Sequence, residues 1–104
     1  MFTSGNKAAI AADTAEPLQT RNAAGVGGAP FAFGYLTLDP AASGPARFGG
    51  SNVKVTTNIG ALLMPGDTVP IYSTGAAEPH HTADTYVAFT GNAAGDNVGW
   101  TIHR

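Results

Sequence analysis

The stretch that decides the fold is Phe31-Ala32-Phe33-Gly34-Tyr35-Leu36-Thr37-Leu38, which stops at Asp39-Pro40. Its aromatic residues stand at every second position, and two residues is the side-chain period of a β-strand. The small residues Ala32 and Gly34 alternate with them on the opposite face. The pattern predicts a strand with an aromatic face, which begins the β-rich part of the chain.

Further short β-rich runs, separated by turn residues, follow this strand. They cover residues 53–57, 59–64, 68–74, 84–90 and 98–102, with turn-forming sequences at 65–67 and 91–97. Pro70 has no N–H group, so the run that contains it is expected at a sheet edge or pairs only from Ile71 onward. About five or six strands at this spacing predict an all-β fold, a small antiparallel β-sandwich or β-barrel.

The large apolar side chains of these runs form the predicted core. They are Phe31, Phe33, Tyr35, Leu36, Leu38, Val53, Val55, Ile59, Leu62, Val69, Ile71, Val87, Phe89, Trp100 and Ile102. A chain of 104 residues is large enough for one such core.

Residues 1–30 contain few large apolar residues. Their large apolar residues, Phe2, Ile10, Leu18 and Val26, fall eight positions apart and cannot line one face of a compact element. The glycine-rich segment 25–30 is typical of a hinge. We therefore predict an extended N-terminal arm over residues 1–30 that orders on a partner, followed by a β domain over residues 31–104.

The composition favours a protein partner. Only 12% of the residues are charged, about half the usual share, yet no stretch is apolar for long enough to span a membrane. The formal net charge of -2 gives no electrostatic footprint for nucleic acid or an anionic membrane. A surface coated with small neutral residues suits permanent contact with other protein.

The chain has no cysteine, which excludes disulfides, thiolate metal sites and a cysteine nucleophile. This composition fits synthesis in a reducing cytoplasm. Residues 1–10 lack the basic and apolar regions of a secretory signal, so we expect no export by the general secretion route.

No catalytic motif is present, and none of the serines stands in a Gly-x-Ser-x-Gly elbow. The metal-capable side chains are His80 and His81, with Glu78, Asp84 and His103 as further candidates. Adjacent residues of an extended chain point to opposite sides, so a solvated loop is favoured over a metal site. A pH-sensitive contact is a second interpretation of the histidines. We predict no enzymatic activity, no cofactor and no metal.

The predicted partner contacts come from two regions. Phe48 lies in the glycine-rich segment 46–50 without an evident core position, and Arg47 precedes it. Arginine and aromatic residues dominate binding hot spots, so this pair is the first candidate. The full set of predicted contacts is Arg47, Phe48, Leu18, Arg21 and Val26.

The passage from Gly27-Gly28-Ala29-Pro30 to Tyr35-Leu36-Thr37-Leu38-Asp39 leads from the predicted arm through a hinge into the first strand. In an Ala-, Gly- and Thr-rich chain of low charge, this layout resembles the head decoration (cement) proteins of tailed bacteriophages. The family has no signature that assigns functional residues.

The resemblance implies a small β protein, often a homotrimer, that is made in the host cytoplasm. It implies a place on the outer surface of an icosahedral virion, where the protein stabilises contacts between major capsid protein subunits.

Two other functions stay open. A receptor- or glycan-binding knob of a phage fibre or surface protein predicts exposed aromatic residues around Phe48 or Tyr72, because aromatic rings stack on sugar rings. An enzyme or metal protein would be built around His80, His81 and Asp84.

Overall fold

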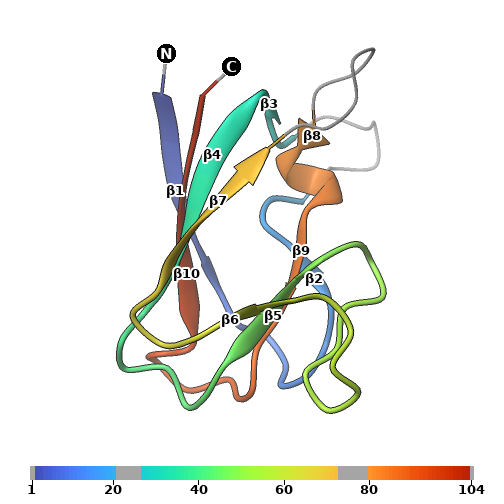
Figure 1. Ribbon diagram of the computed structural model, residues 1–104, viewed down its shortest axis with the longest axis vertical. Coiled ribbons are helices and arrows are strands. Elements are labelled where there is room, and N and C mark those ends of the chain that lie inside the picture. Colours follow the sequence, from blue (N-terminus) through green and yellow to red (C-terminus); the bar gives the residue numbers. More distant parts are fainter. Residues whose placement is uncertain (1, 21–26, 73–79, 104) are drawn as a thin grey trace.

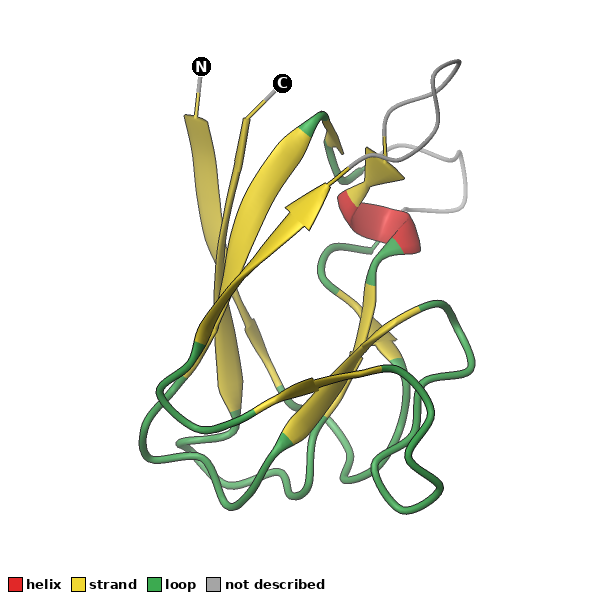
Figure 2. Ribbon diagram, viewed as in Figure 1, coloured by secondary structure: helices red, strands yellow, loops and turns green. Residues whose placement is uncertain are grey.

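The computed structural model describes residues 2–20, 27–72 and 80–103, and these residues form an all-β protein (Figure 2). The strands are β1 (Phe2–Ala8), β2 (Glu16–Pro17), β3 (Pro30–Phe31), β4 (Phe33–Leu38), β5 (Ala46–Gly49), β6 (Ala61–Leu63), β7 (Thr68–Tyr72), β8 (His80–His81), β9 (Tyr86–Ala88) and β10 (Asn97–His103). One short 3-10 helix, Thr82–Asp84, follows β8. In the described part of the chain, no helix is long and apolar enough to cross a membrane.

The strands form two four-stranded antiparallel sheets that face each other across the core (Figure 1). The first sheet has the order β1-β10-β4-β7, and the second has the order β2-β9-β5-β6. The short strands β3 and β8 pair with each other as a third, two-stranded element. The predicted all-β class is therefore confirmed, and of the two predicted architectures, sandwich and barrel, the structure has the sandwich.

The strand pairings are nested like the two arms of one long folded hairpin. β1 pairs with β10, β2 with β9, β3 with β8, β4 with β7, and β5 with β6. Two further pairings, β10 with β4 and β9 with β5, join the folded hairpin into the two sheets. This order is the jelly-roll arrangement of a β-sandwich.

The extended N-terminal arm is not found over residues 2–20. β1 pairs along its whole length with β10, from Phe2 opposite His103 to Ala8 opposite Asn97. Main-chain hydrogen bonds hold an edge strand, so β1 needs no period of large apolar side chains. The remaining residues of the predicted arm include 21–26, which lie outside the described residues. Segments on both sides of Pro30 share both sheets.

Most of the predicted core is confirmed, with six exceptions. Buried as expected are Phe31, Leu36, Leu38, Val53, Ile71, Val87, Phe89, Trp100 and Ile102, and the core also holds Leu18, Leu63 and Val98. The prediction was wrong for Tyr35, Ile59 and Leu62, which are exposed, while Phe33, Val55 and Val69 are half-buried. Tyr35 alternates along β4 with buried Leu36, so it must face outward.

A buried carboxylate, Asp96, ties together the loops at one end of the sandwich. Its oxygens accept hydrogen bonds from the Ser43 N–H (2.9 Å), the Ser43 hydroxyl (2.6 Å) and the Ala93 N–H (3.0 Å). Burial opposes ionisation of Asp96, but these hydrogen bonds outweigh it and lower the pKa of the carboxyl.

A second buried carboxylate, Glu16, holds the segment that follows β1. It accepts hydrogen bonds from the N–H groups of Ile10 (3.0 Å) and Ala11 (2.9 Å), and its Oε1 lies 3.0 Å from Lys7 Nζ. Burial raises the pKa of Glu16, and the two N–H groups together with Lys7 lower it further than burial raises it. The net pKa is below the ordinary value, so the ion pair is part of the fold.

Candidate protein-binding face

The outward surface of the first sheet is the main candidate site. Trp100, Leu36 and Ile71 point into the core, so the residues that alternate with them point outward. The outer face consists of Phe2, Ser4, Asn6 and Ala8 on β1; Asn97, Gly99, Thr101 and His103 on β10; Phe33, Tyr35 and Thr37 on β4; and Thr68, Pro70 and Tyr72 on β7.

This outer face carries no Asp, Glu, Lys or Arg among its described residues. Two pairs of hydroxyl groups bond to each other across neighbouring strands, Ser4 with Thr101 (2.9 Å) and Thr37 with Thr68 (2.8 Å). Covering a charge costs desolvation energy, whereas these hydroxyls already have partners within the sheet. The face can therefore be covered by another molecule at a low electrostatic cost.

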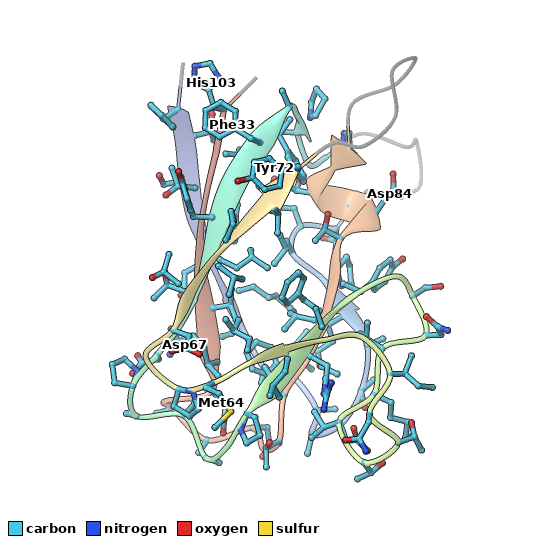
Figure 3. The ribbon with its side chains drawn as sticks, in the orientation of Figure 1. Phe33, Met64, Asp67, Tyr72, Asp84 and His103 are labelled. Atoms are coloured by element: carbon cyan, nitrogen blue, oxygen red, sulfur yellow. The ribbon has the colours of Figure 1, made fainter. Side chains whose placement is uncertain are left out.

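Aromatic rings gather at the end of the outer face that carries both chain termini (Figures 1 and 3). Phe33 stacks on the His103 ring with a centroid distance of 4.9 Å, and Phe2 contacts the same ring edge-on at 4.9 Å. Tyr72 stands opposite Phe33 in the next strand and is 61% exposed. Tyr35 is 45% exposed in the middle of the face. Exposed aromatic rings on an uncharged surface are typical of a protein-binding site.

The outer face is smaller than a standard protein interface. Strands about 4.8 Å apart, with the longest seven residues in length, present roughly 400 Å². A standard specific interface buries about 800 Å² per partner, so the outer face supplies about half of that area.

Arg47 and Phe48, which the sequence predicts as a joint contact, do not share one face of the second sheet. They are neighbours on β5, so their side chains point to opposite sides of the second sheet. The Arg47 guanidinium donates to the Gly60 carbonyl and to Asn58 Oδ1, both at 3.1 Å. Phe48 is half-buried and packs against the core. Arg47 lies on the outward side of the second sheet, where its own loop binds it.

The other predicted partner contacts are Leu18, Arg21 and Val26. Leu18 is 3% exposed and belongs to the core, so its assignment as a partner contact is wrong. Its burial follows from its position directly after β2, which pairs with β9 in the second sheet. Arg21 and Val26 lie outside the described residues.

An open groove lies between the free edge of β7 and the second sheet. It has a volume of about 490 Å³ and is lined by Phe31, Phe48, Gly49, Gly50, Pro70, Ile71, Tyr72, Asp84 and Thr85. Aromatic side chains beside a carboxylate offer the contacts that a sugar ring uses, an apolar surface and a hydrogen-bond acceptor.

The histidine cluster is not assembled in the described residues. The Nδ1 atom of His81 accepts a hydrogen bond from the Ala83 N–H at 3.1 Å and caps the 3-10 helix. His103 lies among the aromatic rings of the first sheet, and Figure 3 shows it well separated from Asp84. Glu78 lies outside the described residues. No three His, Cys, Asp or Glu side chains of the described ranges stand close enough to hold a metal.

The outer face was not predicted, because Phe33 and Tyr35 were expected in the core. The available signal was Leu36 and Leu38, which share one face of the same strand and need burial more than tyrosine does.

Comparison of the chain with protein-family models, curated proteins and solved structures finds no match. The fold and the chemistry of the outer face are therefore the basis for assigning a function.

Proposed function

We propose that the protein is a capsid decoration protein, a virion structural component that binds the outer surface of an icosahedral head. In this function it stabilises contacts between major capsid protein subunits and acts by binding, without catalysis or a cofactor. The observation that carries the proposal is the outer face of the first sheet, which is uncharged and has exposed aromatic rings at one end.

The jelly-roll order supports the proposal without selecting it. Viral capsid proteins, lectins and cupins all use this arrangement, so the function has to be argued from the surface. The uncharged outer face fits a broad protein surface better than it fits a small substrate, because it offers area without a deep pocket. Many weak copies on a repeating lattice then bind strongly through multivalency.

The test is binding to tailed-phage capsids that were assembled without a decoration protein. Tyr35→Asp places a charge in the middle of the outer face, and Leu62→Asp is the matched control, because Leu62 is exposed to a similar extent (47%) on the second sheet. We expect saturable co-sedimentation of the unmodified protein, at least tenfold weaker binding of Tyr35→Asp, and unchanged binding of Leu62→Asp. Equal binding by both variants, or no binding of the unmodified protein, contradicts the proposal.

The groove favours a second candidate function, a receptor- or glycan-binding knob. Phe48 is half-buried at this groove, and Asp84 provides a carboxylate. Binding to cell-surface polysaccharide that is lost in Asp84→Asn but retained in Tyr35→Asp would support the knob over the decoration protein.

A further inference from the structure

Each of the two four-stranded sheets has two edge strands, and these four strands differ in how they are protected from pairing with another chain. An exposed edge presents unpaired N–H and C=O groups, to which another chain can pair. β7 carries Pro70 in its middle, β2 has two residues and one of them is Pro17, and β6 has only three residues. Short length and proline are the usual means by which proteins prevent edge pairing.

The edge strand β1 has neither form of protection. It runs for seven residues, Phe2–Ala8, and contains no proline. Its one charged side chain, Lys7, turns inward to Glu16 and is 11% exposed. β1 is therefore the open edge of the described molecule.

The hydrogen bonds beyond the end of β1 show which of its backbone groups face outward. The Ala9 N–H donates to the Asp96 carbonyl at 2.8 Å, so the odd-numbered residues of this segment direct their backbone groups toward β10. The N–H and C=O groups of Phe2, Ser4, Asn6 and Ala8 then point away from the sheet. On β7 the same alternation makes residue 70 one whose backbone groups point away from β4. Because Pro70 has no N–H group, it blocks pairing of another chain to this edge.

We propose that β1 pairs with β1 of a second copy of this chain, antiparallel and centred on Gly5. In this register Ser4 stands opposite Asn6 of the second copy, and Phe2 stands opposite its Ala8. All four residues have outward-facing backbone groups, so each pair exchanges two main-chain hydrogen bonds. Lys7 stands opposite Thr3 of the second copy, so no like charges oppose each other.

The second copy is the occupant that the charge pattern favours. Two copies of one surface normally bring like charges together, but the outer face beside β1 has no Asp, Glu, Lys or Arg in its described residues. The pairing joins two first sheets into one continuous sheet and doubles the uncharged face. It produces a dimer with a two-fold axis, in place of the homotrimer that the resemblance implies.

The first experiment measures the mass of the full chain by sedimentation equilibrium, without any capsid. Asn6→Pro removes one outward N–H from β1, and Thr68→Pro is the matched control, because Thr68 occupies an outward-facing position on the edge strand β7. We expect a dimer for the unmodified chain and for Thr68→Pro, and at least a tenfold larger dissociation constant for Asn6→Pro. If Asn6→Pro fails to fold, Asn6→Lys provides the same test with an exposed charge.

A monomer at the highest concentration, a trimer, or a dimer that Asn6→Pro and Asn6→Lys leave intact overturns the proposal. The result does not depend on the capsid experiment. A monomeric chain that still binds capsids contradicts only the β1 pairing, and a dimer that ignores capsids contradicts only the decoration function.

A second experiment tests the register. The chain has no cysteine, so Ser4→Cys and Asn6→Cys each introduce a single thiol. In the proposed register the mixed dimer brings these two thiols opposite each other, about 5.5 Å apart between Cα atoms, within reach of a disulfide. Two copies of Ser4→Cys alone would place the thiols about 9 Å apart, too far for a bond. Cross-linking only in the mixture supports the register, and cross-linking in the single variants contradicts it.

Discussion

Gly5 and Trp100 stand opposite each other on β1 and β10, and the indole ring fills the space above the glycine. A Cβ atom at position 5 would lie 2.7 Å from Cε2 of the ring. Within the described residues the buried Nε1 of Trp100 has no hydrogen-bond partner, so packing alone holds the ring. β1 therefore packs closely against the Trp100 ring because position 5 has no side chain.

Gly5→Ala should destabilise the protein by about 1–3 kcal/mol, because the ring has to move out of its packed position. Gly99→Ala is the control, since a Cβ there has no atom within 4 Å. We expect this change to be neutral or slightly stabilising. Urea unfolding monitored through the fluorescence of Trp100, the single tryptophan of the chain, measures both effects. Equal stabilities of the two variants would contradict the packing argument.

Acid should destabilise the protein because it protonates three hydrogen-bonded carboxylates, Asp13, Glu16 and Asp96. Hydrogen bonds lower the pKa of Asp13, mainly through the Thr56 hydroxyl, and the pKa values of Glu16 and Asp96 are lowered despite burial. A lowered folded-state pKa means that the stabilisation is complete above the unfolded-state pKa, about 4, and is lost as the pH falls through the folded-state values.

Melting temperatures should therefore change little between about pH 7 and pH 5 from this source and fall steeply below about pH 4. Asp96→Asn should reduce the steepness, because one of the three carboxylates no longer titrates. A main loss of stability above about pH 5 would contradict the assignment to these carboxylates.

Removing Glu16 should cost more than removing its ion-pair partner. Glu16→Ala leaves the N–H groups of Ile10 and Ala11 and the Lys7 ammonium without their acceptor, so we expect a loss of about 3–5 kcal/mol. Lys7→Met keeps the length of the side chain and leaves the two N–H bonds to Glu16, so the loss should be smaller. Equilibrium unfolding of both variants and of the double variant measures the coupling.

Arg47→Ala should leave partner binding within about twofold of the unmodified protein, because its guanidinium is bound to Gly60 and Asn58 of its own chain. The change should instead loosen the loop between β5 and β6, with a loss of about 0.5–1.5 kcal/mol. Capsid co-sedimentation and thermal unfolding separate the two effects. A tenfold loss of binding with unchanged stability would restore Arg47 as a contact residue.

The all-β class was predictable from the sequence because it depends on local patterns. Pro70 correctly placed its strand at a sheet edge, and most large apolar side chains of the later strands are buried as expected. β1 was not predictable in this way, because Gly5 and Lys7 face inward where an ordinary strand has apolar residues. Gly5 fits there because the Trp100 ring fills the space beside it, and Lys7 fits because it pairs with Glu16.

The candidate face was missed for a related reason. A strand with apolar residues on both faces, such as β4, does not indicate which face is covered within its own chain. Leu36 faces the core, and Tyr35 therefore faces outward, because the second sheet lies on only one side. This choice depends on sheet packing, which local patterns do not contain.

The nested pairing of strands has a consequence for how the molecule is made. The partner of β1 is β10, so β1 is synthesised long before the strand with which it pairs. The β5–β6 hairpin can form early, since its strands are close in sequence, and each further pair closes a longer loop around it. Until translation reaches residue 97, β1 has no β10 to pair with, and the N–H and C=O groups on both sides of its backbone are left without partners in a sheet.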